Sequence, residues 1–252
     1  MKYSIFSRKT DEITLSTIKK IKDNLKLEYD ENNPDIVITV GGDGTILRAV
    51  HKYIDIIDKV VFFGVKTGHL GFYTNFTIDT VDDLINKINT NKFDIETHSL
   101  LEWETSKNKG YAINEITIIN PTQTQIVDVF IDNEKFETVR GTGICISTTN
   151  GSTAFNKSLN GPVVDHLLEC IILNEIAPIN SNAYRSLNSP LVLSTHHKLE
   201  LKFDNANFLT SDHLKFELEN EDFVKCVLAS KKIRFARRTN TEFMDRIKKA
   251  FL

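Results

Sequence analysis

The stretch Asp35-Ile36-Val37-Ile38-Thr39-Val40-Gly41-Gly42-Asp43-Gly44-Thr45 decides how this chain folds. Its first half is a β-branched apolar run after Asn33-Pro34, which predicts a short buried strand. The glycines predict a tight turn, and the residues from Thr45 onward are typical of a helix. Such an arrangement forms an anion site, because backbone N–H groups can approach phosphate oxygens and the helix N-terminus carries partial positive charge.

Asp43 is the informative residue of this turn. A carboxylate would repel arriving phosphates unless it holds a metal ion or accepts the proton of an attacking hydroxyl, so the turn favours phosphoryl transfer over dinucleotide docking. An ordinary tight turn is the alternative, since Gly and Asp are common in turns. The Rossmann fingerprint does not fit because Leu47 stands at its third glycine position, and no Gly-Lys-Ser/Thr follows as in a Walker A loop.

Composition bounds the class of protein. A chain of 252 residues suffices for one large or two ordinary domains. A net charge of −3 provides no broad basic surface, so we expect no nucleic-acid partner. The longest apolar runs, such as 60–65, are too short to cross a membrane, so no membrane association is expected. The N-terminus runs directly into charged residues, so we expect no signal peptide.

Cysteine and histidine usage narrows the class further. Three widely spaced cysteines, an odd number, predict buried thiols in a reducing compartment and therefore a cytoplasmic protein. The histidines include no His-Glu-x-x-His pattern. We expect the adjacent His196 and His197 to point in opposite directions on a strand, which argues against a shared metal ion. No metal-ligating residues are predicted.

The pattern of elements changes near residue 94. Before it, apolar periodicity predicts alternating strands and helices, over 2–7, 11–27, 35–40, 45–54, 60–65 and 78–90. After it, strand-like segments follow one another, over 93–105, 111–119, 126–131, 135–140, 144–147, 190–194, 198–203, 213–219, 223–228 and 232–238. The alternation predicts a parallel sheet covered on both faces, and the later strands predict a second domain with largely antiparallel sheets. A basic tail helix is expected last, with Phe243, Ile247 and Phe251 four residues apart.

A second polar, glycine-rich stretch, 140–158, interrupts the later strands. A strand leads into small hydroxyl and amide residues, and a helix is expected from about Ser152. These side chains are either helix caps or hydrogen-bonding partners for a ribose, an amide or a diphosphate. Phe155 is either a stacking surface for a base or an ordinary core residue.

Asn114 and Glu115 lie within an otherwise apolar predicted strand. Buried polar groups need partners. The pair is therefore expected either to form local hydrogen bonds at a strand end or to be satisfied by a network or a ligand.

Four segments occur in the order found in NAD kinases, and the chain resembles the shorter form from Gram-positive bacteria over residues 1 to about 250. These segments are Gly41-Gly42-Asp43-Gly44-Thr45, Lys66-Thr67-Gly68-His69-Leu70-Gly71-Phe72, Asn114-Glu115 and Gly151-Ser152-Thr153-Ala154-Phe155. The resemblance implies transfer of a phosphoryl group from ATP, or in some members from inorganic polyphosphate, to the adenosine ribose 2′-hydroxyl of NAD, giving NADP. It also implies a divalent cation, Mg²⁺ being expected.

The resemblance further implies an organisation in three parts. These are an α/β domain over 1–93, a mainly antiparallel β-sandwich that binds the dinucleotide over 94–231, and a tail over 232–252 that returns to the first domain. A homo-oligomer, commonly a tetramer, is implied as well.

The resemblance also assigns the site residues. Asp43 takes the catalytic role, with Gly42 and Gly44 beside it and Arg48 facing phosphate. The Asn-Glu pair contacts the adenosine part. The remaining binding positions are Arg140, Thr142, Asn150, Thr153, Ala154, Phe155, Ser158 and Ala177.

The chain departs from the family pattern at four positions. Thr142 stands between two glycines where the family has an aspartate, while Thr149, Asn150 and Phe155 replace a proline, a hydroxyl residue and a tyrosine. Phe155 keeps the stacking surface, and Thr149 removes a conformational restraint on the loop. Two other functions stay open at this point: a kinase of another substrate with the same glycine-rich turn, and a dinucleotide-binding sensor that no longer catalyses.

Overall fold

The structure is a computed structural model that describes residues 1–68, 71–180, 185–204, 206, 208–218, 223–237 and 242–252. Its internal contacts divide the chain into two compact units. We call Met1–Thr97 with Lys232–Leu252 the α/β unit, and His98–Lys231 the β unit. Each has its own hydrophobic core.

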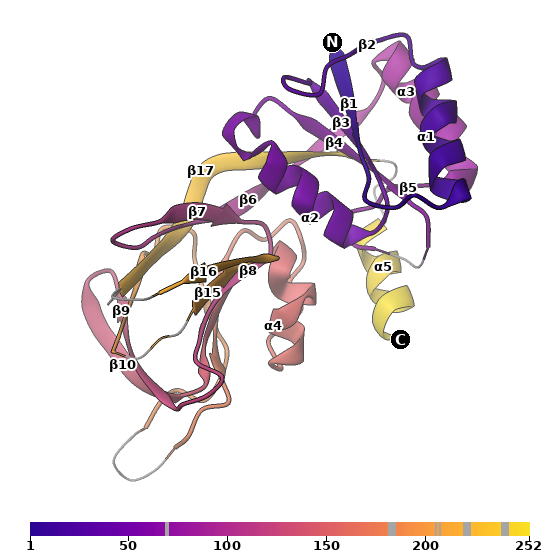
Figure 1. The fold of residues 1–252 in the computed structure, drawn as a ribbon. Helices are drawn as coiled ribbons and strands as arrows, with labels where there is room; N and C mark the ends of the chain where they lie inside the picture. The colour runs from indigo at the N-terminus through magenta and orange to yellow at the C-terminus, as the bar shows by residue number, and fades with distance from the viewer. Residues whose placement is uncertain (69–70, 181–184, 205, 207, 219–222, 238–241) are drawn as a thin grey trace. The chain divides into compact units, whose positions relative to one another are not determined.

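The α/β unit is built on a parallel sheet in the order β17-β4-β3-β1-β2, with β5 beside β4 (Figure 1). Its strands are β1 (Lys2–Phe6), β2 (Glu28–Tyr29), β3 (Ile36–Val40), β4 (Val61–Lys66), β5 (Phe76–Thr77) and the C-terminal end of β17 (Phe223–Arg237). Its helices are α1 (Glu12–Asn24), α2 (Asp43–Lys52), α3 (Val81–Thr90) and α5 (Glu242–Phe251), with 3₁₀ turns η1 (Ile54–Ile56) and η2 (Ile78–Thr80).

Strand β3 is buried along its whole length, as a central parallel strand must be. Ile36 and Ile38 pack in one core cluster with residues of α1 and α3, including Ile21 and Leu84. Helices α1 and α3 lie side by side, and α2 lies apart from them (Figure 1). Side chains alternate between the two faces of a strand, so Ile36 and Ile38 lie on one face of β3 and Val37 on the other. All three are buried, so both faces of the strand are covered.

The β unit consists of two largely antiparallel sheets. One, β10-β9-β14-β17 with β6 and β7, is part of an 11-stranded sheet that continues through β17 to β4 of the α/β unit, and the other has the order β13-β12-β11-β8-β15-β16. The strands are β6 (Asp94–Glu104), β7 (Lys109–Ala112), β8 (Glu115–Ile119), β9 (Gln125–Ile131), β10 (Glu134–Gly141), β11 (Gly143–Thr148), β12 (Ile171–Ile176), β13 (Leu191–Leu193), β14 (Leu199–Phe203), β15 (Phe208–Ser211) and β16 (Leu214–Glu217). The short helices are η3 (Asn150–Thr153) and α4 (Phe155–Ser158).

The predicted fold class is confirmed, since a parallel α/β unit is joined to a mainly antiparallel one. Every second side chain along the strands of the β unit points into its core. Ile116 and Ile118 of β8 pack there with Ile144 and Ile146 of β11. Strand β17 contributes to a ladder in each unit: Phe223 to Cys226 pair with β14, and Arg234 and Phe235 pair with β4.

Helix α2 begins earlier than predicted. We expected it from Thr45, but it begins at Asp43, with Gly42 as its N-cap. The amides of Thr45 and Ile46 donate to the Gly42 carbonyl at 2.9 and 3.4 Å, so part of the glycine-rich turn is already helical. The low helix propensity of glycine made Thr45 the expected first residue. The helix begins earlier because its first hydrogen bonds are made by backbone groups, and helix ends are commonly uncertain by one or two residues.

Several predictions for the β unit were wrong. The single strand over 111–119 is broken between Ala112 and Glu115, because Asn114 and its neighbour bond to side chains instead of the ladder. Strands β12 and β15 were missed, and the two strands expected over 223–228 and 232–238 are one continuous strand, β17. The helix expected from Ser152 is a 3₁₀ turn followed by one helical turn. Glu219 and Arg238, at the ends of two predicted strands, lie outside the described residues.

The prediction of buried thiols without disulfides is confirmed, since all three cysteines are free and buried. The histidine prediction was wrong, because His196 and His197 lie in a turn with ring centroids 4.4 Å apart. Among the described residues, no helix is both long and apolar enough to span a bilayer.

Replacing Ile38 with Ala should destabilise the α/β unit. Ile38 is fully buried, so the free energy of unfolding should fall by about 2–5 kcal/mol. Ile13→Ala is the matched control, because Ile13 is 56% exposed and its loss should change stability by less than about 0.5 kcal/mol. Denaturant titrations of both variants make the comparison; equal losses would contradict the assigned core.

Candidate functional site

The glycine-rich turn leads from β3 directly into the N-terminus of α2. Gly41 has φ +156°, and a Cβ built on it would lie 2.9 Å from the Cβ of Thr45, so only glycine fits there. Gly42 caps the helix without a side-chain bond, and both Gly42 and Gly44 are exposed. The first N–H groups of α2 can therefore bind an anion, with Arg48 half-buried in the next turn.

Asp43 is the first residue of α2, but its carboxylate bonds to a neighbouring loop and not to the helix's own amides. It accepts the amide hydrogens of Phe72 at 2.6 Å and Tyr73 at 3.1 Å, one on each oxygen. Gly71 makes this possible, since a Cβ at Gly71 would lie 2.8 Å from the Asp43 Cγ. The carboxylate is thereby fixed beside the helix N-terminus.

The protonation of Asp43 follows from these contacts. Burial raises its pKa above the ordinary value for aspartate, while the Phe72 and Tyr73 amides and the charge of Arg246 oppose the rise. Arg246, on α5, also donates to the Phe72 carbonyl and to the Asn75 Oδ1. A carboxylate with a raised pKa is a better proton acceptor than an exposed one.

The loop before these amides belongs to the second sequence segment. His69 and Leu70 lie outside the described residues. The Phe72 ring stacks on Phe251 of α5 at a centroid distance of 5.8 Å. Helix α5 therefore packs on the loop that binds Asp43.

In the β unit, Asn114 and Glu115 lie at the start of β8, where the predicted strand is broken. The carboxylate of Asp212 accepts the amide hydrogens of Ile113 at 2.9 Å and Asn114 at 2.8 Å. The Asn114 carbonyl accepts the Thr148 amide hydrogen at 2.8 Å. The pair does lie at a strand end, but its backbone bonds to Asp212 and Thr148, which are distant in sequence, so a hydrogen-bond network satisfies it and not the local bonds that were the alternative.

The polar loop packs directly on this pair. A Cβ at Gly151 would lie 2.9 Å from the Asn114 Cα, so the two backbones touch. The Phe155 amide donates to the Glu115 carboxyl. Through Gly151 and Phe155, the loop that also carries the predicted positions Asn150, Thr153 and Ala154 lies against the pair. Ser158 ends α4 and is exposed, and the Phe155 ring is 42% exposed.

Glu115 is a buried carboxyl with an unusual protonation. Burial, followed by the negative charge of Asp212, raises its pKa to about 8, and the Phe155 amide opposes this. Its Oε2 has no hydrogen-bond partner among the residues that the structure describes. A buried polar atom of this kind is expected to meet a ligand or water.

Thr149, one of the departures from the family pattern, ties the loop to the following segment. Its hydroxyl donates to the Leu168 carbonyl and accepts the Cys170 amide hydrogen at 3.2 Å. A proline lacks both bonds. Hydrogen bonding here replaces the restraint that a proline ring would give.

Three predicted positions lie at the opposite end of β11. Thr142 precedes this strand, and its amide donates to the Ile176 carbonyl at 2.9 Å, next to Ala177. The Arg140 carbonyl accepts the Ile179 amide hydrogen at 2.7 Å. Because β11 has six residues, these positions are separated from Asn150 by a strand length of roughly 17 Å. The structure does not bring them together with the Asn-Glu pair.

No described cluster of three His, Cys, Asp or Glu residues could hold a metal ion. Both Asp43 oxygens accept backbone hydrogens. A Mg²⁺ ion arriving with the substrate would therefore be held mainly by phosphates and waters, which is its usual mode in phosphoryl-transfer sites.

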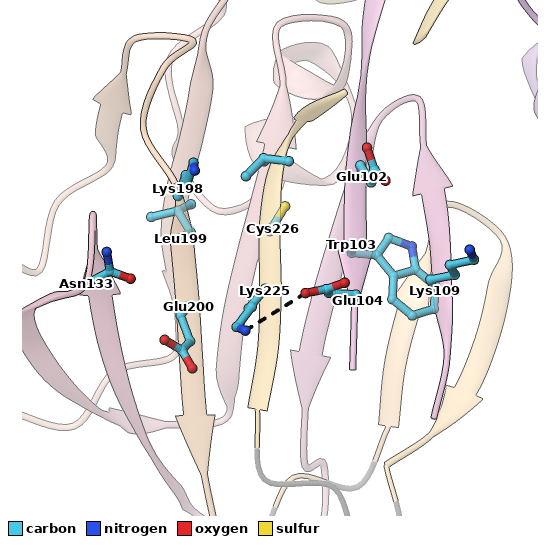
Figure 2. Close-up of a pocket in the computed structure, with 11 residues that line it drawn as sticks. Glu102, Trp103, Glu104, Lys109, Asn133, Lys198, Leu199, Glu200, Lys225 and Cys226 are labelled. Carbon is cyan, nitrogen blue, oxygen red and sulfur yellow. Dashed lines mark ion pairs between the residues drawn. The ribbon is translucent and has the colours of Figure 1, made fainter. Parts of the chain in front are cut away.

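One pocket of the β unit lies away from all predicted positions. It has a volume of about 470 Å³ and is lined by β6, β7, β14 and β17 (Figure 2). Its lining contains both lysines and glutamates, and Lys225 forms an ion pair with Glu104 at 3.9 Å. It contains none of the predicted site residues.

Sequence reasoning missed the residues that position the site. Gly71 was quoted only as part of a motif, while Arg246 and Asp212 were not singled out. An aspartate between two short strands is a turn signal that could have drawn attention to Asp212. The partners of these three residues lie far away in sequence, so spacing gives no sign of them.

A helix N-terminus with exposed glycines in one unit, and a polar loop packed on a buried carboxyl in the other, are features suited to a nucleotide-binding class of protein. The chain matches the ATP-NAD kinase N-terminal domain over residues 3–93 and the ATP-NAD kinase C-terminal domain over 113–238. It therefore belongs to the NAD kinase family, as the resemblance in sequence predicted.

Individual relatives agree with this assignment. The chain is 39% identical to an NAD kinase of Geobacillus stearothermophilus over 97% of this chain and 94% of that one. It is 39% identical to NAD kinase 1 of Bacillus subtilis over 100% and 98%. An NAD kinase from Archaeoglobus fulgidus in complex with ATP shares the fold, with a TM-score of 0.83, 24% identity and coverage of 99% and 98%. Yeast NADH kinase complexed with NADH has a TM-score of 0.85, 18% identity and coverage of 99% and 87%.

Replacing Glu115 with Gln should change how stability depends on pH. The folded-state pKa of Glu115 is raised to about 8, so the wild type should lose stability as pH rises from about 4.5, where the unfolded chain ionises, to about 8. Glu115→Gln should lack this loss. The difference in the free energy of unfolding between the variant and the wild type should therefore change by roughly 2–4 kcal/mol between the two pH values. Denaturant titrations of the ligand-free proteins at pH 5 and 8.5 measure it. Parallel pH profiles would show that Glu115 does not titrate in this range.

Proposed function

We propose that this chain transfers the γ-phosphoryl group of ATP to the adenosine ribose 2′-hydroxyl of NAD, giving NADP and ADP. The observation that carries this proposal is the Asp43 carboxyl, fixed by two amides at the N-terminus of α2 in a member of the NAD kinase family. A simple turn would not need a half-buried carboxylate with a raised pKa.

The chain's residues supply positioning and proton transfer. The exposed amides at the start of α2, with Arg48, bind phosphate oxygens. The ribose O2′ attacks the γ-phosphorus, the bond from that phosphorus to the bridging oxygen breaks, and ADP leaves. Asp43 accepts the hydroxyl proton as general base. When bound, a Mg²⁺ ion neutralises charge on the phosphates.

We further propose that the β unit binds the dinucleotide. Asn114 and Glu115 contact the adenosine part, with Asn150, Thr153 and Ala154 as hydrogen-bonding neighbours. Phe155, with its partly exposed ring, offers a stacking surface. Arg140, Thr142, Ser158 and Ala177 line other parts of the ligand. We expect a homotetramer in the cytoplasm.

The direct test is incubation of the purified protein with ATP, Mg²⁺ and NAD, followed by assay of NADP. Formation of NADP supports the proposal. Binding of NAD without NADP formation would identify a sensor instead, and phosphorylation of other alcohols in preference to NAD would identify a different kinase.

Asp43→Asn should lower kcat while leaving NAD binding intact. The amide cannot accept the proton, and general-base assistance is worth about 10²–10⁴ in rate. Because both carboxylate oxygens accept amide hydrogens, the variant keeps one of the two bonds and should stay folded. Single-turnover NADP formation and NAD calorimetry test this. More than about a tenth of the wild-type rate would rule out general-base catalysis of that size.

Gly71→Ala should also reduce kcat, without touching a substrate. The added methyl group would collide with the Asp43 carboxyl and displace it, so we expect a loss of at least about tenfold. Gly68→Ala is the matched control on the same loop, since nothing lies within 4 Å of its Cβ position. Steady-state assays of both variants make the comparison, and equal activities would show that the Asp43 position does not limit the rate.

A further inference from the structure

Asp212 occupies the turn between β15 and β16 in a left-handed conformation, with φ 53°. Aspartate and asparagine tolerate this conformation better than other non-glycine residues. Its amide donates to the Glu115 carbonyl at 3.0 Å. The turn is thus attached to the start of β8 through the backbone.

The Asp212 carboxylate binds three consecutive amides. Its Oδ2 accepts from Ile113 at 2.9 Å, and its Oδ1 accepts from Asn114 at 2.8 Å and from Glu115 at 3.4 Å. The β15–β8 ladder ends at the pairing of Ser211 with Ile116, so these amides lie just beyond it. A carboxylate can satisfy them together, and charge-assisted bonds are stronger than neutral ones.

The same segment is bound on its acceptor side by the polar loop. The Thr148 hydroxyl donates to the Ile113 carbonyl, and the Thr148 amide donates to the Asn114 carbonyl. The backbone of Asn114 and Glu115 is therefore fixed from both sides. The buried Glu115 Oε2 remains without a described partner.

We propose that Asp212 is a positioning residue for dinucleotide binding, which holds the Ile113-Asn114-Glu115 backbone so that the Asn114 and Glu115 side chains meet the adenosine part. This inference rests on the proposed function, because it assumes that the pair contacts NAD. In this role Asp212 acts through the backbone that it binds and needs no contact of its own with the ligand.

The charge of Asp212 has a second effect on the pair. Among the described residues, Asp212 and the Cys145 thiol, whose own pKa burial raises to about 12, interact electrostatically with Glu115. Asp212 is therefore the negative charge that helps keep Glu115 protonated near neutral pH. A neutral carboxyl can both donate and accept a hydrogen bond.

The test compares Asp212→Asn with Asp132→Asn. Asp132 is a matched control, because it has the same φ of 53° and its carboxylate accepts the Lys198 amide hydrogen at 2.9 Å. Asparagine keeps the left-handed turn but loses the charge and one acceptor. We expect Asp212→Asn to raise KM for NAD about tenfold, with kcat and KM for ATP within about twofold of wild type.

Two further readouts separate positioning from a general loss of structure. Amide hydrogen exchange over 113–115 in the ligand-free protein should accelerate about tenfold in Asp212→Asn and not in Asp132→Asn. The pKa of Glu115, followed by carbon NMR, should fall in Asp212→Asn because a like charge is removed. Asp212→Glu, which keeps the charge, should leave the Glu115 pKa raised and increase KM for NAD less than Asp212→Asn does.

An unchanged KM for NAD in a folded Asp212→Asn enzyme, or an equal change in Asp132→Asn, would overturn the inference. If Asp212→Asn does not fold, Asp212→Gly decides, because it keeps the left-handed turn and removes the carboxylate, and wild-type protection together with an unchanged KM in that variant would overturn the inference. Failure of the proposed function looks different, since the wild type itself would then form no NADP while the exchange difference would persist.

Discussion

Two backbone amides, those of Phe72 and Tyr73, hold the Asp43 carboxylate, and the proposed chemistry depends on this contact. A carboxylate beside a phosphate-binding helix terminus is useful only in a fixed position and with a suitable pKa. The amides fix it, burial raises its pKa, and Gly71 leaves room for it. Arg246 binds the carbonyl of Phe72, so the C-terminal helix stabilises the loop from behind.

The β unit uses the reverse arrangement, since the Asp212 carboxylate holds three amides of the segment that carries Asn114 and Glu115. In both places a carboxylate and neighbouring backbone amides fix a short segment at the end of a regular element. Such bonds are charge-assisted, and they are made between groups of the protein alone.

Much of the α/β unit and of the Asp43 turn could be predicted from the sequence. Strand β3 and helix α1 follow from apolar periodicity, and the Asp43 turn follows from the chemistry of its residues. Strands β12 and β15 could not be predicted, because Ile171–Ile176 reads equally as a buried helix segment and Phe208–Ser211 is only four residues long. The break at Asn114 depends on Asp212, about a hundred residues away, and local patterns carry no such information.

Chemical rescue of Asp43→Ala tests the central claim most directly. The truncation removes the base and leaves the Phe72 and Tyr73 amides able to donate hydrogen bonds to an external carboxylate such as formate. We predict that NADP formation falls at least about a hundredfold and then rises in proportion to formate, but not to chloride at equal ionic strength, while the wild type does not respond. A variant that keeps a rate within tenfold of the wild type in the absence of formate would contradict the account.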